Sequence, residues 1–321
     1  MASEQQEKEW AKGQYPFRFL NYTVDRKEKI ATVTMHDPTG RDTAPNWAAL
    51  ELDELMEEWE RDDDVKVVIL KSDGRDFCRG HDLGHYLTDI AHARDVAKDA
   101  AEGRRYRRTN RQSILGRQET GGERSLIYSL KPTIAQVHGR CIEYGMAYLA
   151  GCDMAIASDD AHFGHLGQVI GMSGLSPTIR SIAGMGYKRY REMMTTGRTF
   201  NARQAVEMGL INRVVRREDL DQEVWDEARR IAVIPLDGLV TGKYHAGLVL
   251  KAMDAGLNLT NVFWAGFMPN LKHERDEFHF FEVVREKGVG EAIKQRRAIY
   301  DPLGGFGVDG EKPFVAPDAD V

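Results

Sequence analysis

Short runs of β-forming residues alternate with helical segments through the first half of the chain, and this alternation restricts the fold most strongly. Residues 65–70 (VKVVIL) are almost continuously apolar, which is typical of a strand buried on both faces. Residues 47–61 carry apolar side chains at helical spacing, and they follow an earlier β-rich run at residues 30–35 (IATVTM). Strands that alternate with helices indicate βαβ units, so we expect an α/β fold.

The same reading continues toward the C-terminus. We expect strands at residues 133–137 and 154–157 and helices at residues 83–117, 201–208, 220–232 and 274–299. We expect an N-terminal extension (1–27), a core (28–215), a helical C-terminal region (216–300) and an irregular tail (301–321) rich in Gly, Pro and Asp.

Composition and charge exclude several classes of protein. The formal net charge of −6 over 321 residues argues against a general nucleic-acid binder. Three cysteines at unrelated spacings (Cys78, Cys141 and Cys152) indicate reduced thiols rather than disulfides or a zinc site. The N-terminus lacks the apolar core of a signal peptide, and the most apolar stretch, residues 134–157, contains charged side chains that a membrane span does not tolerate. We therefore expect a cytoplasmic protein without a metal or a membrane partner.

Two strand-to-turn connections are the candidates for chemistry. The first is residues 76–83 (DFCRGHDL), where Gly80 lets the backbone turn sharply after a buried strand. The second is residues 131–147 (KPTIAQVHGRCIEYGMA), where a strand again leads into a turn that opens a helix. Two such turns can direct two backbone N–H groups at one point, which is the requirement for an oxyanion hole.

The order of these segments resembles the crotonase (enoyl-CoA hydratase/isomerase) family. The quoted turns, the segment GCDMAIAS and the later segment TGRTFNARQAVEMGLINRVV are similar to family motifs in the same order, over roughly residues 28–300. The resemblance implies a crotonase-like spiral of repeated ββα units in the core and a helical C-terminal trimerisation region. It also implies an acyl-CoA substrate, an enolate-like oxygen held by two N–H groups, and a homotrimer or a hexamer (dimer of trimers).

Residue by residue, the resemblance assigns the two N–H donors to His81 and Tyr144. It also reveals departures, because the positions of the two hydratase glutamates hold Ala147 and Gly167, and the acid of an isomerase or dehalogenase subset falls near Leu175. Two carboxylates are the usual means of activating water and protonating the α-carbon. The sequence therefore predicts a reaction other than the standard two-glutamate hydration.

The remaining candidates for proton transfer are His81, Glu143, Tyr144 and His165. Strand alternation would direct His165 to the same side as residue 167, and histidine suits acid–base chemistry near neutral pH. We hypothesise that His165 is the acid or base, with Glu143 orienting substrate, water or an imidazole. The alternatives are a polar His165 on a strand edge, a His81 that contributes only its backbone, and a Glu143 that forms a structural ion pair.

The resemblance leaves isomerisation, decarboxylation and C–C bond hydrolysis open, with no cofactor beyond the CoA of the substrate. One alternative is a β-diketone C–C hydrolase acting on a cyclic substrate without CoA, and another is a catalytically silent member that binds acyl-CoA or RNA. The Arg-rich run at residues 104–108 is either a solvated helix face or a site for CoA phosphates. Apolar C-terminal residues predict an oligomer interface, namely Val262, Phe263, Trp264, Phe267, Met268, Phe278, Phe280 and Phe281.

Overall fold

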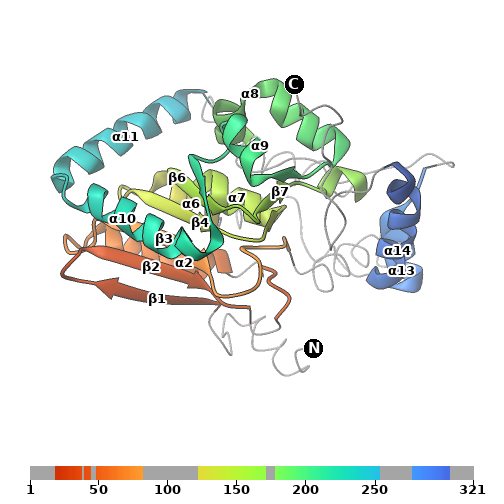
Figure 1. Cartoon of the computed structure of the whole chain (residues 1–321), viewed down its shortest axis with the longest axis horizontal. Helices are drawn as coiled ribbons and strands as arrows, with labels where there is room; N and C mark the ends of the chain where they lie inside the picture. Colours follow the sequence, from red (N-terminus) through yellow and green to blue (C-terminus); the bar gives the residue numbers. More distant parts are fainter. Residues whose placement is uncertain are drawn as a thin grey trace, which may run out of the picture.

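A computed structural model describes residues 19–37, 40–44, 48–81, 122–170, 178–253 and 277–303. The predicted helix at residues 83–117, with its Arg-rich run, lies outside these ranges. The described chain forms a six-stranded sheet in the order β1-β2-β3-β4-β6-β9, in which every pair is parallel except β1 with β2 (Figure 1). These strands are β1 (Leu20–Asp25), β2 (Ile30–Met35), β3 (Val67–Ser72), β4 (Thr133–Val137), β6 (Met154–Ser158) and β9 (Arg213–Val215).

A second, three-stranded sheet branches from the carboxyl end of the large one. It consists of β5 (Arg140–Ile142), β7 (His162–Gly164) and β8 (Phe200–Asn201), in the order β5-β7-β8. β5 follows β4 and β7 follows β6, so the chain runs from a strand of the large sheet directly into a strand of the small one twice in succession. This arrangement, together with the helices, is the α/β fold of repeated ββα units that the resemblance implied.

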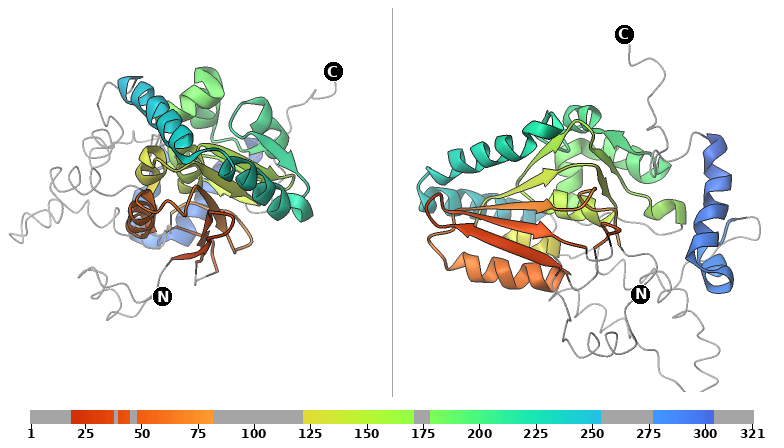
Figure 2. Two further views of the ribbon diagram at one scale, coloured as in Figure 1. Left: turned by 90° about the vertical axis from the view of Figure 1, so that its left-hand side faces the viewer. Right: turned by 60° about the horizontal axis from the view of Figure 1, so that its bottom comes forward.

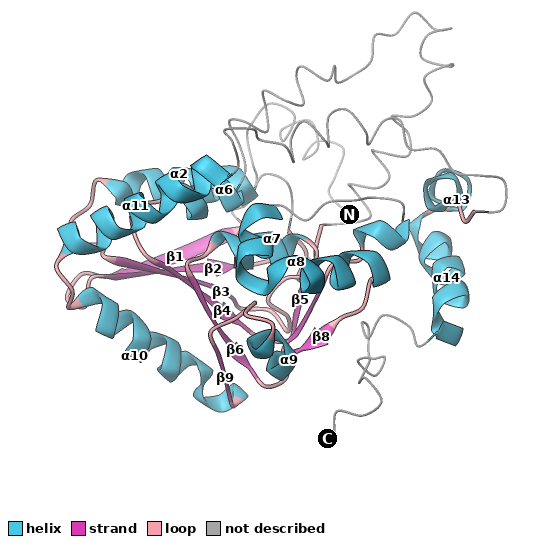
Figure 3. Cartoon of the chain, turned by 90° about the horizontal axis from the view of Figure 1, so that it is seen from above, coloured by secondary structure: helices cyan, strands magenta, loops and turns pink. Residues whose placement is uncertain are grey.

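Helices cover both faces of the large sheet, which explains its apolar strands. α10 (Leu220–Ala232) lies on one face, and α2 (Ala48–Glu60), α6 (Gly122–Tyr128) and α7 (Tyr144–Gly151) lie on the other (Figure 3). Alternate strand residues pack against α10 in a cluster formed by Ile30, Val67, Ile69, Ile134, Ile156, Leu220, Val224 and Ala228. The prediction of a strand buried on both faces is confirmed, since nearly all of β3 is buried.

The remaining helices lie toward the C-terminus. They are α8 (Thr178–Thr196), α9 (Ala202–Glu207), α11 (Leu236–Met253), α13 (Phe280–Lys287) and α14 (Val289–Tyr300), with short 3₁₀ segments at Gly167–Ile170, Arg217–Asp219 and Asp301–Leu303. α13 and α14 stand beside the main body of the molecule (Figure 2). The helical segment predicted at residues 274–299 is divided into two helices, because Gly288 adopts a φ of 84° and separates α13 from α14.

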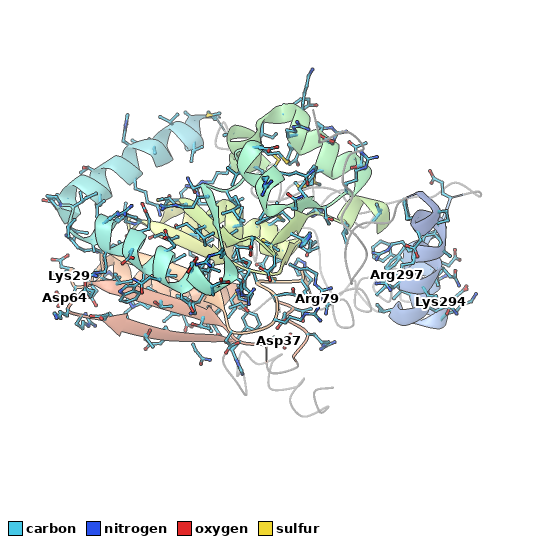
Figure 4. The ribbon with its side chains drawn as sticks, viewed as in Figure 1. Lys29, Asp37, Asp64, Arg79, Lys294 and Arg297 are labelled. Carbon is cyan, nitrogen blue, oxygen red and sulfur yellow. The ribbon has the colours of Figure 1, made fainter. Side chains whose placement is uncertain are left out.

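The large sheet begins earlier than the expected core. β1 pairs along its whole length with β2, from Leu20 with Met35 to Asp25 with Ile30, although the sequence placed these residues in an N-terminal extension. An ion pair of 3.1 Å joins Lys29, in the turn between these strands, to Asp64 before β3 (Figure 4). The strand was missed because its outward-facing positions are polar, as suits a strand at the edge of a sheet.

The structure also shows the state of the cysteines and the character of the helices. All three cysteines are free and buried, as expected for thiols in apolar surroundings. Among the helices that the structure describes, none has the length and apolar character needed to cross a bilayer.

Candidate active site

The two predicted turns meet through their backbones. After β3, the chain runs alongside β5, and Cys78 forms a parallel bridge with Cys141. The N–H of Cys78 donates to the Arg140 carbonyl at 3.0 Å, and the N–H of Ile142 donates back to the Cys78 carbonyl at 2.8 Å. This backbone pairing fixes the first turn, which ends at His81, against the second turn, which leads into α7.

Small residues permit this close approach. A Cβ at Gly145 would lie 2.8 Å from the Cys78 carbonyl oxygen, which is closer than packing allows. Gly80 has a φ of 100°, which a side chain strongly disfavours. The carboxylate of Asp76 holds the two segments together, because it accepts hydrogen bonds from the Arg140 backbone N–H at 2.8 Å and from Arg140 Nε at 2.9 Å.

The two predicted oxyanion donors converge on a single oxygen. The backbone N–H groups of His81 and Tyr144 both donate to Oε2 of Glu143, at 3.1 Å and 2.8 Å. Tyr144 is the first residue of α7, so its N–H lacks a partner within the helix and the helix dipole favours negative charge there. These two N–H groups, called the oxyanion pocket below, therefore have the geometry and the electrostatics to bind an anionic oxygen, and in this structure that oxygen belongs to Glu143.

The imidazole of His81 contacts the same oxygen. Its Nδ1 lies 2.6 Å from Oε2 of Glu143, and its ring stacks on Tyr144 with centroids 4.4 Å apart. Because an ionised carboxylate only accepts, Nδ1 carries the proton in the neutral ring. Burial would raise the pKa of Glu143, but the charge and hydrogen bonds of His81 lower that pKa to about 2. Glu143 is therefore an ionised carboxylate at neutral pH.

His165 lies on the other side of the same carboxylate. Its side chain is 3% exposed, and its Nε2 is 3.9 Å from Oε1 of Glu143. Nδ1 accepts a hydrogen bond from the Gly167 N–H at 3.2 Å, so Nε2 carries the proton in the neutral ring and faces Glu143 as a donor. Burial lowers the pKa of His165, which favours this neutral form.

The reason given for the position of His165 is wrong. β7 ends at Gly164 and a 3₁₀ segment begins at Gly167, so strand alternation does not relate residues 165 and 167. The hydrogen bond between them fixes the imidazole instead.

Glu143 has an unusual backbone conformation. It adopts a φ of 53° and a ψ of −103°, a region that side chains rarely occupy. Its N–H donates to the Gly164 carbonyl at 2.9 Å, and its side chain caps the first N–H of α7. Strain of this kind often marks a functional position. The sequence carried a signal for it, since a carboxylate directly before a helix commonly caps that helix.

Other predicted residues lie away from this cluster or outside the described chain. Ala147 is buried inside α7 and does not contact the carboxylate. Leu175 lies outside the described residues. Within the part of the chain that the structure describes, no group of side chains is arranged to hold a metal ion.

Comparison with known proteins identifies the family of the chain. Residues 25–258 match the family described as enoyl-CoA hydratase/isomerase. The 4-chlorobenzoyl coenzyme A dehalogenase-1 of Arthrobacter sp is 27% identical over 228 residues, which cover 70% of this chain and 78% of that protein. The hydroxycinnamoyl-CoA hydratase-lyase of Pseudomonas fluorescens is 27% identical over 219 residues, with coverage of 68% and 74%.

A solved structure gives the same result for the fold. The crystal structure of an enoyl-CoA hydratase/isomerase from Xanthobacter autotrophicus Py2 superposes with a TM-score of 0.71 at 25% identity, over 88% of this chain and 98% of that one. The family match covers well over half of the chain. The chain shares its fold with this solved structure, and its two turns form one anion-binding site. The chain therefore belongs to the enoyl-CoA hydratase/isomerase (crotonase) family.

Proposed function

We propose that this protein transforms an acyl-CoA thioester through an enolate whose oxygen is held by the N–H groups of His81 and Tyr144. The observation that carries the proposal is their convergence on one anionic oxygen, at 3.1 Å and 2.8 Å. Fixed backbone dipoles stabilise a developing oxyanion because they need not reorganise during the reaction. Two relatives are named for reactions of CoA thioesters, which supports the substrate class.

The reaction we propose is isomerisation, decarboxylation or C–C bond hydrolysis rather than standard hydration. Ala147 and Gly167 stand where hydratases of the family carry glutamates, and neither side chain ionises. The pocket instead brings one carboxylate, Glu143, between two imidazoles. Such a cluster can move one proton at a time to or from an enolate, which these three reactions require.

The tautomers of the two histidines support different roles for them. His165 presents Nε2–H toward Glu143 and accepts at Nδ1, so in its neutral form it is a donor to the carboxylate. We therefore propose His165 as a positioning partner that donates its Nε2–H to Glu143, whereas the acid role in the hypothesis drawn from the sequence would require the protonated ring. The base is then Glu143 or His81.

Deuterium incorporation at the α-carbon tests the enolate directly. The full chain is incubated in D₂O with a panel of saturated, unsaturated and β-keto acyl-CoA thioesters, and the products are analysed by mass spectrometry. We expect deuterium in at least one thioester, because decarboxylation and C–C bond cleavage protonate the enolate at the α-carbon and isomerisation protonates it at the γ-carbon. Cleavage of a cyclic β-diketone without any labelled thioester would favour the non-CoA hydrolase. Binding of thioesters without labelling would favour a silent family member.

Substitution of His165 tests its role in that reaction. We expect His165→Ala to lower kcat by about 10²–10⁴-fold, which is typical for loss of a proton-transfer group. His165→Gln keeps an N–H donor near the position of Nε2 without a titratable group. Recovery in this variant indicates positioning, and continued loss indicates proton transfer. Near wild-type kcat in His165→Ala would exclude this residue and transfer the role to Glu143 or His81.

A further inference from the structure

Glu143 occupies the position that a substrate oxygen must take. Its Oε2 accepts from both backbone donors of the pocket and lies 2.6 Å from Nδ1 of His81. Both donors are fixed, one by the start of α7 and the other by the backbone pairing of Cys78 with β5. Since neither N–H group can follow a second oxygen elsewhere, a thioester carbonyl and the carboxylate compete for the same point.

A second hydrogen-bond partner for the carboxylate lies beside the pocket. The Nε2–H of His165 faces Oε1 of Glu143 from 3.9 Å. Rotation of the Glu143 side chain that carries Oε2 away from the two N–H groups can bring Oε1 to hydrogen-bond distance of this Nε2–H. His165 is held for this role, because the Gly167 N–H fixes its Nδ1 at 3.2 Å and burial keeps the ring neutral.

We propose that Glu143 is a two-position carboxylate that fills the oxyanion pocket of the free enzyme and is displaced toward His165 by the substrate thioester, where it becomes the base. The proposal rests on the proposed function and extends it. On displacement, the backbone N–H groups of His81 and Tyr144 bind the thioester oxygen. The Nδ1–H of His81 faces the same point and becomes a third donor to it.

The proton transfer balances within the site. The α-carbon C–H bond breaks, its electron pair forms the carbon–carbon double bond of the enolate, and the carbonyl π pair moves to the oxygen in the pocket. Glu143 takes the proton and becomes a neutral carboxylic acid that later returns it to carbon.

Displacement also makes Glu143 a stronger base, which favours removal of the α-proton. Inside the pocket the hydrogen bonds and charge of His81 lower the pKa of Glu143 to about 2, so the carboxylate is a weak base. When the carboxylate leaves these donors, burial acts to raise that pKa. The base is therefore strengthened only after the substrate oxygen has entered.

The test compares two ligands that differ in one carbonyl group. An acyl-CoA thioester and the matching S-alkyl-CoA thioether are titrated by calorimetry into the full chain. Glu143→Gly is the main variant, because glycine tolerates the φ of 53° and serves as a helix cap with little loss of stability. Glu143→Gln is the second variant, since its amide oxygen can still fill the pocket. Glu218→Ala is the control, on an exposed side chain of another surface.

We expect Glu143→Gly to raise the thioester affinity by about tenfold relative to the thioether, because the pocket is vacated and only the thioester has an oxygen to place there. Glu143→Gln should raise it less, and Glu218→Ala should not change it. Both Glu143 variants should lose α-deuterium incorporation by about 10²–10⁴-fold, because the base is absent.

Two results would overturn the proposal while leaving the proposed function intact. One is an unchanged ratio of thioester to thioether affinity in Glu143→Gly, and the other is near wild-type deuterium incorporation in that variant. Failure of every protein to bind either CoA compound would instead overturn the proposed function, and this inference with it.

Discussion

His165 is a buried neutral histidine, and its environment makes folding stability depend on pH. Burial lowers the pKa of His165 below 6.5 in the folded chain. As the pH falls, His165 therefore binds a proton in the unfolded chain before it does so in the folded chain. The stabilising contribution is therefore fully present above the unfolded pKa of about 6.5 and is lost progressively below it. We expect the stability advantage of the wild type over His165→Gln to shrink between pH 7.5 and pH 5.5.

Urea unfolding at several pH values measures this difference. His138 also has a pKa lowered by burial, but it is present in both proteins and its effect cancels. Glu143 stays ionised in the wild type over this range, since its pKa is about 2. A stability difference that does not change with pH would show that His165 has the same affinity for protons in the folded and unfolded chains.

The sequence predicted the members of the cluster better than their contacts. His81 and Tyr144 were assigned as donors from the family motifs, and their N–H groups do converge. Glu143 was expected to orient substrate, water or an imidazole, and its Oε2 lies 2.6 Å from Nδ1 of His81. The occupation of the pocket by the same carboxylate was not predicted, because it depends on the φ of 53° at Glu143 and on a turn far away in the sequence.

At the scale of elements, α7 packs directly against the first turn because Gly145 has no side chain. A Cβ there would lie 2.8 Å from the Cys78 carbonyl oxygen and 2.9 Å from the Cys78 Cβ. We expect Gly145→Ala to cost about 1–3 kcal/mol of folding stability, as overpacking typically does. It should also reduce catalysis, because the two N–H donors move apart.

Gly290→Ala is the matched control for this change. Gly290 is the second residue of α14, as Gly145 is of α7, and a Cβ at Gly290 meets nothing within 4 Å. Thermal unfolding and the deuterium assay should show little change in this variant. Equal effects of the two substitutions would mean that the contact with Cys78 is not what makes Gly145 important.

Local patterns predicted many elements because burial and periodicity act over short stretches. β2, β4 and α10 occupy the predicted residues, and α2 and α9 differ from their predictions only near the ends. The helical segment predicted at residues 274–299 is divided at Gly288, where the φ of 84° ends a pattern that is otherwise helical on both sides. The small sheet was also not predicted, since its strands have three residues or fewer and pair over long separations.

For the whole molecule, the alternation of strands and helices and the order of the motifs were enough to predict the fold. The position of the apolar C-terminal residues was less predictable. Phe280 and Phe281 are buried in the chain's own packing, so assigning them to an interface between subunits is wrong. Val262, Phe263, Trp264, Phe267 and Met268 lie outside the described residues. Burial inside one chain and burial between chains produce the same pattern in a sequence.

Exposed apolar side chains on α11 now support the prediction of a homotrimer or a hexamer. Tyr244, Leu248, Val249 and Met253 are each 45–56% exposed in the single chain. Large apolar side chains gathered on one helix often mark a contact with another subunit. We expect the wild type to be a trimer or hexamer by light scattering at micromolar concentration.

The variant that tests this contact is Leu248→Glu combined with Val249→Glu. Two new carboxylates in an apolar interface lack partners, and burying them costs several kcal/mol per subunit. We expect the double variant to be a folded monomer, with the circular dichroism spectrum of the wild type. Lys294→Glu, on a side chain of α14 that is 80% exposed, should leave the mass unchanged. A wild-type monomer would contradict the predicted assembly, whereas a double variant that keeps the wild-type mass would place the interface away from α11.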